Sequence, residues 1–148
     1  MSASTIQVGK LPALLLRAPD GAEATITLYG AHLVSWKSVS GTGGAPQERM
    51  FMSSLSALDG SRALRGGVPV IFPQFAERGS GMRHGFARVS TWRVLDSGEQ
   101  DGGQLPELNG RSAHDKILLR LTLQEHQPRF CQDPGRRQVI RLFASGGL

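Results

Sequence analysis

Short stretches of apolar or alternating residues, separated by glycine, proline and aspartate, constrain most strongly what this 148-residue chain can fold into. Residues 24–28 alternate apolar and polar side chains with a period of two, and a similar stretch follows at residues 32–36. This period places one face of a strand against a core. Residues 18–21 (APDG) carry the proline and glycine that favour a tight turn. We therefore expect antiparallel strands joined by turns, with a bulge or bend at Gly30.

The same pattern continues in the second half of the chain. Residues 91–95 have the composition of another strand, and residues 117–123 place every second apolar side chain on one face. Residues 38–48 are rich in glycine, serine and proline, which predicts an exposed loop. The sequence contains no long helical period and no alternation of strands with helices. It predicts an all-β fold, an antiparallel β-sandwich, in a chain long enough for one domain or part of one.

The formal charge of +5 is concentrated near the carboxyl end of the sequence. Residues 127–148 contain four arginines and one aspartate, so this basic tail holds +3 of the excess. One tyrosine and two tryptophans in the whole chain make a poor stacking platform for single-stranded nucleic acid. We therefore expect no nucleic-acid partner. Because its composition differs from the rest, we expect the tail to lie outside the folded domain.

The cysteine count and the hydropathy of the sequence indicate the cellular compartment. The single cysteine, Cys131, excludes an intramolecular disulfide framework and offers no zinc-finger spacing. The opening residues MSASTIQVGK lack the basic and apolar regions of a signal peptide, and no apolar run reaches the length needed to span a bilayer. We expect a cytoplasmic protein without a membrane partner or a metal site.

Residues 64–92 carry the side chains best suited to chemistry. Arg65 precedes two glycines, which allow the backbone to approach a ligand closely. Arg83, His84 and Arg88 then fall within six positions. A single arginine or histidine is more often a surface or structural residue, but guanidinium groups bind phosphate oxygens bidentately and stay charged at physiological pH. The group suits an anionic, hydroxyl-rich ligand such as a sugar phosphate.

This segment resembles the signature of the glucose-6-phosphate 1-epimerase family, also called the hexose-6-phosphate mutarotases. The family motifs R-G-G-I-P, F-P-x-F-G and Q-H-G-F-A-R followed by tryptophan correspond to RGGVP at 65–69, FPQF at 72–75, and HGFAR at 84–88 with Trp92. Upstream, YGAHLVSWK at 29–37 is similar to an early strand pair of the family. The resemblance extends over about residues 25–125, and residues 127–148 match nothing in the family.

The resemblance implies a galactose-mutarotase-like β-sandwich that interconverts the α and β anomers of hexose 6-phosphates, chiefly glucose 6-phosphate, without metal or organic cofactor. A carboxylate base takes the proton of the C1 hydroxyl while a histidine acid protonates the ring oxygen. Arg65 and Arg88 match substrate-binding arginines, and His84 matches a residue of the same pocket. Arg83 stands where the family usually has glutamine, which replaces a neutral amide by a permanent charge.

The family's catalytic histidine and glutamate have no counterpart in this sequence. Neither His114 nor His126 lies in a family motif, and the same holds for Glu107 and Glu125. We therefore expect residues 1–126 to form the amino-terminal part of a sandwich that is incomplete at its carboxyl end, with no catalytic residue of its own. The alternative to a truncated enzyme is a non-catalytic module that binds a sugar phosphate or a partner. A complete protein of this kind is expected to be a monomer, whereas uncovered strand edges would favour association.

Overall fold

The computed structural model describes residues 2–39, 44–99, 116–123 and 139–145, and from residue 95 onward it describes only the course of the backbone. Almost all regular structure is β-strand. The strands are β1 (Ser2–Val8), β2 (Leu11–Arg17), β3 (Glu23–Thr27), β4 (His32–Ser38), β5 (Gln47–Glu48), β6 (Trp92–Glu99), β7 (Lys116–Leu123) and β8 (Val139–Ser145), with one 3-10 turn, η1 (Ala87–Val89).

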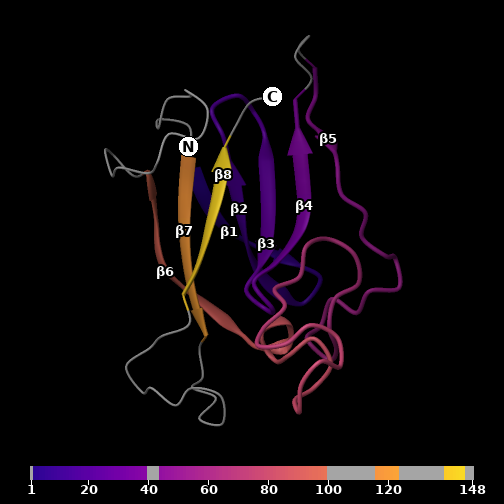
Figure 1. The fold of residues 1–148 in the computed structure, drawn as a ribbon. Coiled ribbons are helices and arrows are strands. Elements are labelled where there is room, and N and C mark those ends of the chain that lie inside the picture. The colour runs from indigo at the N-terminus through magenta and orange to yellow at the C-terminus, as the bar shows by residue number, and fades with distance from the viewer. Residues whose placement is uncertain (1, 40–43, 100–115, 124–138, 146–148) are drawn as a thin grey trace.

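The strands form two antiparallel sheets. The first has the order β1-β2-β3-β4-β5 and the second the order β6-β7-β8, so both are simple meanders in which neighbours in sequence pair. Figure 1 shows β7 and β8 in front of β1 and β2. The second sheet begins against the first, because Trp92 and Val94 at the start of β6 pack on apolar side chains of β2 and β3. This arrangement confirms the predicted all-β fold of antiparallel strands.

The predicted strands and the observed ones agree where the period of two was clear. β3, β4, β6 and β7 lie at the four predicted positions. The bend expected at Gly30 is present, because its φ is 76°. A separate register shift interrupts the pairing of β3 with β4 between Thr25 and Ile26.

Three strands were not predicted. β1 is rich in serine and threonine and largely exposed, so it lacks an apolar period and is defined by its pairing with β2. β5 lies inside the expected loop, where Gln47 and Glu48 pair with the end of β4. β8 lies within residues 127–148 and pairs along its length with β7. The boundary proposed at residue 126 stays a prediction.

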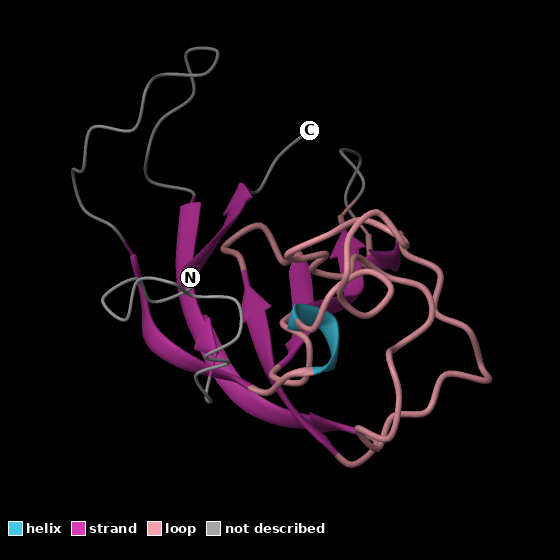
Figure 2. Cartoon of the chain, turned by 60° about the horizontal axis from the view of Figure 1, so that its bottom comes forward, coloured by secondary structure: helices cyan, strands magenta, loops and turns pink. Residues whose placement is uncertain are grey.

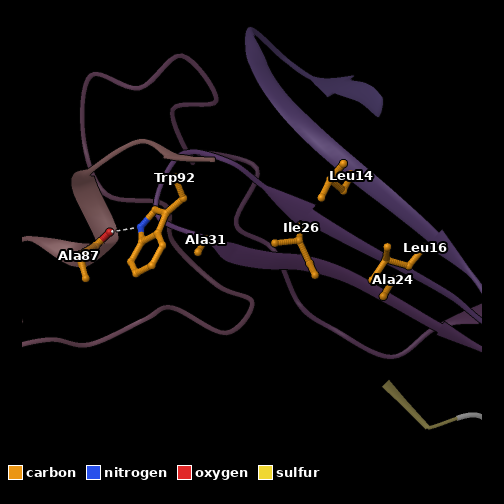
Figure 3. Packing of buried hydrophobic residues seen from close by; sticks show 7 residues of the cluster. All are labelled: Leu14, Leu16, Ala24, Ile26, Ala31, Ala87 and Trp92. Atoms are coloured by element: carbon orange, nitrogen blue, oxygen red, sulfur yellow. Dashed lines mark hydrogen bonds between the residues drawn. The ribbon is translucent and has the colours of Figure 1, made fainter. Parts of the chain in front are cut away.

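The core fills the inner face of the first sheet. Its main cluster combines apolar side chains of β2, β3 and the segment around η1: Leu14, Leu16, Ala24, Ile26, Ala31, Ala87 and Trp92 (Figure 3). The buried indole of Trp92 donates a hydrogen bond from Nε1 to the Ala87 carbonyl, 3.0 Å away. Trp92 therefore joins η1 to the core by both packing and a buried polar contact.

Residues 49–91 form long loops at one end of the first sheet, shown in pink in Figure 2. Isolated backbone bridges attach them to the strands, pairing Tyr29 with Thr91 and Leu33 with Val68. At Gly30 a side chain would lie 2.5 Å from the Arg88 carbonyl, so glycine allows the loop to approach the strand end. No helix in the described ranges is long and apolar enough to cross a membrane.

Replacing Trp92 by phenylalanine tests the role of the indole. Trp92→Phe removes the shorter of two hydrogen bonds accepted by the Ala87 carbonyl and leaves the one from the Ser90 amide at 3.4 Å. One hydrogen bond contributes about 0.5–1.5 kcal/mol. We expect the free energy of unfolding in urea to fall by that amount. Trp36→Phe is the matched control, since the Trp36 side chain is only half-buried. Equal losses in the two variants would contradict the assigned role.

Candidate functional site

The loop that carries Arg65 is shaped by two glycines. Gly66 and Gly67 both have positive φ, 98° and 60°, a conformation that other residues rarely adopt. The Gly67 amide donates to the Phe51 carbonyl at 2.8 Å, and a side chain at Gly66 would lie 2.8 Å from the Met52 Cα. The two glycines therefore let this loop run directly against the strand-like segment at residues 51–52.

Arg65 is held by its backbone and leaves its side chain exposed. Its amide donates to Ser56 Oγ at 3.0 Å, and its carbonyl accepts from the Ser53 amide at 3.0 Å. Within the described part of the chain, the guanidinium has no hydrogen bond or ion pair. The backbone hydrogen bonds fix the position of the Arg65 Cα, and the charged guanidinium remains available to a ligand.

His32 connects β4 to the same loop and was not predicted as a site residue. It is 1% exposed, and its Nε2 lies 2.7 Å from the Gly66 carbonyl. A carbonyl only accepts, so Nε2 carries the proton. Nδ1 is buried and has no partner in the part of the chain that the structure describes. The available signal was its place in the YGAHLVSWK motif, but its contact with a residue 34 positions away is a tertiary feature.

His84 lies in a turn that fixes its imidazole. Its φ is 64°, and its amide donates to the Ala76 carbonyl at 2.9 Å. The Ala76 amide donates back to Nδ1 of the ring at 3.2 Å. The ring also packs edge-on against Phe75, with 5.2 Å between centroids. Because Nδ1 accepts this hydrogen bond, the neutral ring carries its proton on Nε2, which is a free donor among the described contacts.

Arg88 belongs to η1 and points back along the preceding turn. Its Nη2 donates to the Arg83 carbonyl at 2.9 Å, and its Nε is buried without a partner among the described residues. Burial raises the pKa of the nearby Tyr29 hydroxyl, and the charge of Arg88 opposes that rise. The Arg88 side chain thus reaches into a partly buried region and retains unpaired donors there.

The structure brings three of the four predicted residues together. Arg83 and His84 lie in one turn, to which Arg88 of η1 donates a hydrogen bond, and Gly85 places this segment against the Phe72 carbonyl, where a side chain would clash. Beside it lies a hollow of about 240 Å³ lined by Pro73, Gly81, Met82, Gly85, Phe86, Val89 and Ser90. Arg65 lies on a separate loop, and no contact described for it reaches the other three. That the four residues bind one ligand stays a prediction.

The charge of this region is not neutralised internally. Residues 60–90 contain five arginines and one glutamate, a formal charge of +4. The ion pairs in the described ranges join Glu23 to Arg17 and Lys37, on the strands of the first sheet. A concentration of unpaired guanidinium groups on loops attracts anions.

The pH dependence of stability tests the buried state of His32. Burial lowers the pKa of His32 below its ordinary 6.5, although the bond to the Gly66 carbonyl opposes this. His32 therefore binds a proton more readily in the unfolded chain than in the folded one. The folded state keeps its full stability above pH 6.5 and loses part of it as the pH falls from 6.5 toward the folded pKa. We expect the free energy of unfolding to decrease between pH 7.5 and pH 5.5, and to decrease less in His32→Gln. Parallel pH profiles for the two proteins would contradict this assignment.

Comparison with known proteins supports the interpretation of the loop segment. The sequence profile of the family described as aldose 1-epimerase matches residues 12–112. A protein of Cenchrus ciliaris, provisionally named a glucose-6-phosphate 1-epimerase, is 34% identical over 110 residues, which cover 74% of this chain and 31% of that protein. A protein of Salmonella typhimurium with the same provisional name is 38% identical over 84 residues, covering 55% of this chain and 26% of its own length.

A solved structure of a similar protein has a similar fold. The crystal structure of a provisionally assigned mutarotase from Salmonella typhimurium superposes with a TM-score of 0.67 and 25% identity, over 97% of this chain and 43% of that one. The chain therefore spans about a quarter to a third of the curated relatives that it matches, and less than half of the solved structure. The family profile, the sequence identity and the fold agree, and the chain belongs to the aldose 1-epimerase family.

Proposed function

We propose that this chain carries the sugar-phosphate pocket of a hexose-6-phosphate mutarotase, which interconverts the α and β anomers of hexose 6-phosphates, chiefly glucose 6-phosphate. The observation that carries the proposal is the set of donors without acceptors on residues 83–88. Nε2–H of His84 and Nε–H of Arg88 both lack a protein partner among the described residues. Of the two, Arg88 Nε is buried, and an unsatisfied buried donor carries a cost that a ligand oxygen would remove.

The arginines suit the phosphate group. Arg88 is held by one bond from Nη2 to the Arg83 carbonyl, so its guanidinium is oriented before the ligand arrives. Arg65 and Arg83 are exposed and add positive charge from two loops. Arg83 stands where the family usually has glutamine. Its longer side chain ends in a charged guanidinium with several N–H donors, in place of a neutral amide. We infer that the phosphate binds to guanidinium groups of these three residues.

His84 suits the sugar hydroxyls. Its backbone and its Nδ1 are both bound to Ala76, which leaves only Nε2–H to interact with a ligand. A neutral imidazole N–H donates one directional hydrogen bond and adds no charge. In this role His84 orients the sugar ring relative to the phosphate and is a binding residue. The provisional names of the relatives agree with a hexose phosphate as the ligand.

Anomer exchange needs more than binding. A base must take the proton of the C1 hydroxyl, and an acid must protonate the ring oxygen so that the ring opens and C1 rotates. The sequence has no match for the family's catalytic histidine and glutamate. We therefore propose that the chain by itself binds the sugar phosphate and does not accelerate its mutarotation.

A second candidate is a module that binds a protein partner. Three large apolar side chains on the loops are strongly exposed: Phe51 at 77%, Leu55 at 78% and Phe75 at 65%. Exposed apolar side chains of this size favour contact with another protein surface. This candidate predicts association without affinity for a sugar phosphate, so ligand binding separates the two.

Binding of glucose 6-phosphate is the first test, measured by titration calorimetry with Arg88→Ala beside the native chain. A hydrogen bond to a charged group contributes about 1.5–3 kcal/mol, so the dissociation constant should rise about 10- to 100-fold in the variant. Arg17→Ala is the matched control. It removes the same charge from β2, where Arg17 pairs with Glu23 away from the loops. Equal affinity in the Arg88 variant and the native chain would contradict the proposal.

Catalysis is tested separately by exchange spectroscopy of the two anomers with and without the chain. We expect binding without faster exchange. Exchange that is accelerated by the native chain and lost in Arg88→Ala would show a complete active site and overturn the proposed absence of catalytic residues. Absence of binding to the folded chain would overturn the pocket itself.

A further inference from the structure

One buried imidazole joins the first sheet to the loop that carries Arg65. His32 is the first residue of β4 and is 1% exposed. Its Nε2–H donates to the Gly66 carbonyl at 2.7 Å, so the donor comes from a paired strand and the acceptor from an irregular loop. The acceptor is the peptide carbonyl of the residue directly after Arg65. This bond therefore acts on the backbone from which the Arg65 side chain extends.

The loop is shaped closely around the ring. A Cβ atom at Gly67 would lie 2.9 Å from Nε2 of His32, and it would clash with the Leu33 carbonyl. The φ of Gly67, 60°, is also one that a side chain would disfavour. The ring and this glycine occupy adjoining space, so a side chain at Gly67 would collide with the imidazole.

Other contacts hold the loop on both sides of the Gly66 carbonyl, and His32 holds that carbonyl itself. On the carboxyl side, Leu33 and Val68 exchange backbone hydrogen bonds of 3.1 and 2.9 Å. On the amino side, Arg65 is bound through its amide to Ser56 and through its carbonyl to Ser53. Between these anchors lie two adjacent glycines, and the Gly67 amide is bound to the Phe51 carbonyl at 2.8 Å, so the backbone acceptor left to His32 is the Gly66 carbonyl. In the described structure, the Gly66 carbonyl is fixed by the imidazole.

Filling the core does not explain a histidine at this position. Nδ1 is buried without a partner among the described residues, and burying an unpaired polar atom is unfavourable. A leucine would occupy a similar volume without that cost. The bond made by Nε2 is thus the property that histidine brings to this position.

We propose that His32 is a positioning residue that fixes the peptide at Gly66 and thereby directs the Arg65 guanidinium toward the bound phosphate. The inference rests on the proposed function for its ligand, and its structural part can be measured without that ligand. It extends the site from the loops into the first sheet. The ring acts through Arg65 and makes no contact with the substrate.

The structural part is tested by amide hydrogen exchange in three variants. His32→Leu removes the donor, His32→Asn has an amide on a shorter side chain, and His32→Gln can place an amide N–H near the position of Nε2. We expect exchange at the Gly67 and Val68 amides to be about tenfold faster in the leucine and asparagine variants, which corresponds to loss of one hydrogen bond. The glutamine variant should restore slow exchange. Ile26→Val, a core change on β3 away from the loop, is the control for general loss of stability.

The functional part is tested by a double-mutant cycle on glucose 6-phosphate binding. If His32 acts through Arg65, His32→Asn should weaken binding about tenfold in the native background and leave it nearly unchanged when Arg65→Ala is already present. A purely structural role would lower affinity equally in both backgrounds. That result would overturn the proposal.

The outcomes separate the two proposals. If the native chain does not bind glucose 6-phosphate, the proposed function fails, and hydrogen exchange still decides whether His32 orders the loop. Unchanged exchange at Gly67 and Val68 in both His32→Leu and His32→Asn would overturn the positioning role, whatever the affinity. If the leucine variant does not fold, the comparison of asparagine with glutamine gives the same decision, since both side chains are uncharged amides.

Discussion

The close backbone contact between the long loops and the first sheet is the constraint on which the rest of this structure depends. Residues 49–91 contain little regular structure, so their polar backbone groups need partners outside a ladder. Leu33 exchanges backbone hydrogen bonds with Val68, and the Gly30 amide donates to the Ser90 carbonyl. These contacts need glycine at the points of closest approach, because a side chain at Gly30 would meet the Arg88 carbonyl and one at Gly67 would meet the Leu33 carbonyl. The four candidate binding residues, Arg65, Arg83, His84 and Arg88, lie within this attached region.

The site separates backbone anchoring from side-chain chemistry. At Arg65 the amide and carbonyl are bound to serines, whereas the guanidinium is exposed. At His84 the amide and Nδ1 are both bound to Ala76, whereas Nε2 has no partner in the described ranges. Such anchoring fixes the donors before a ligand arrives and lowers the entropy cost of binding. The same separation explains why the loops can be irregular and yet hold defined positions.

The sequence was sufficient to predict the parts of the structure that depend on local pattern. Alternation identified β3, β4 and β7, because their apolar faces repeat every second residue. β1 was missed since its serine and threonine side chains have no such repeat, and only the neighbouring strand defines it. Arg83, His84 and Arg88 were predicted by their spacing and by family resemblance, and the structure joins Arg88 to the turn of the other two by a hydrogen bond to the Arg83 carbonyl. Their role in binding remains a prediction.

The features that were missed depend on contacts between distant parts of the chain. His32 meets the Gly66 carbonyl across 34 residues, and His84 meets Ala76 through a turn with positive φ. Neither partner follows from spacing or propensity, because each arises only when the loop closes on the sheet. The strand β8 has the same origin, since its pairing with β7 joins segments whose compositions differ.

The most direct test of the account is a map of amide chemical-shift changes on titration with glucose 6-phosphate. The account predicts that the amides of residues 65–68 and 83–88 shift together, with one dissociation constant, while those of β1 stay unchanged. That result would place Arg65 and Arg88 on one ligand. Shifts confined to one of the two loops would contradict a shared sugar-phosphate pocket. So would shifts centred on a second hollow, whose lining includes Tyr29, Asp59 and Arg93.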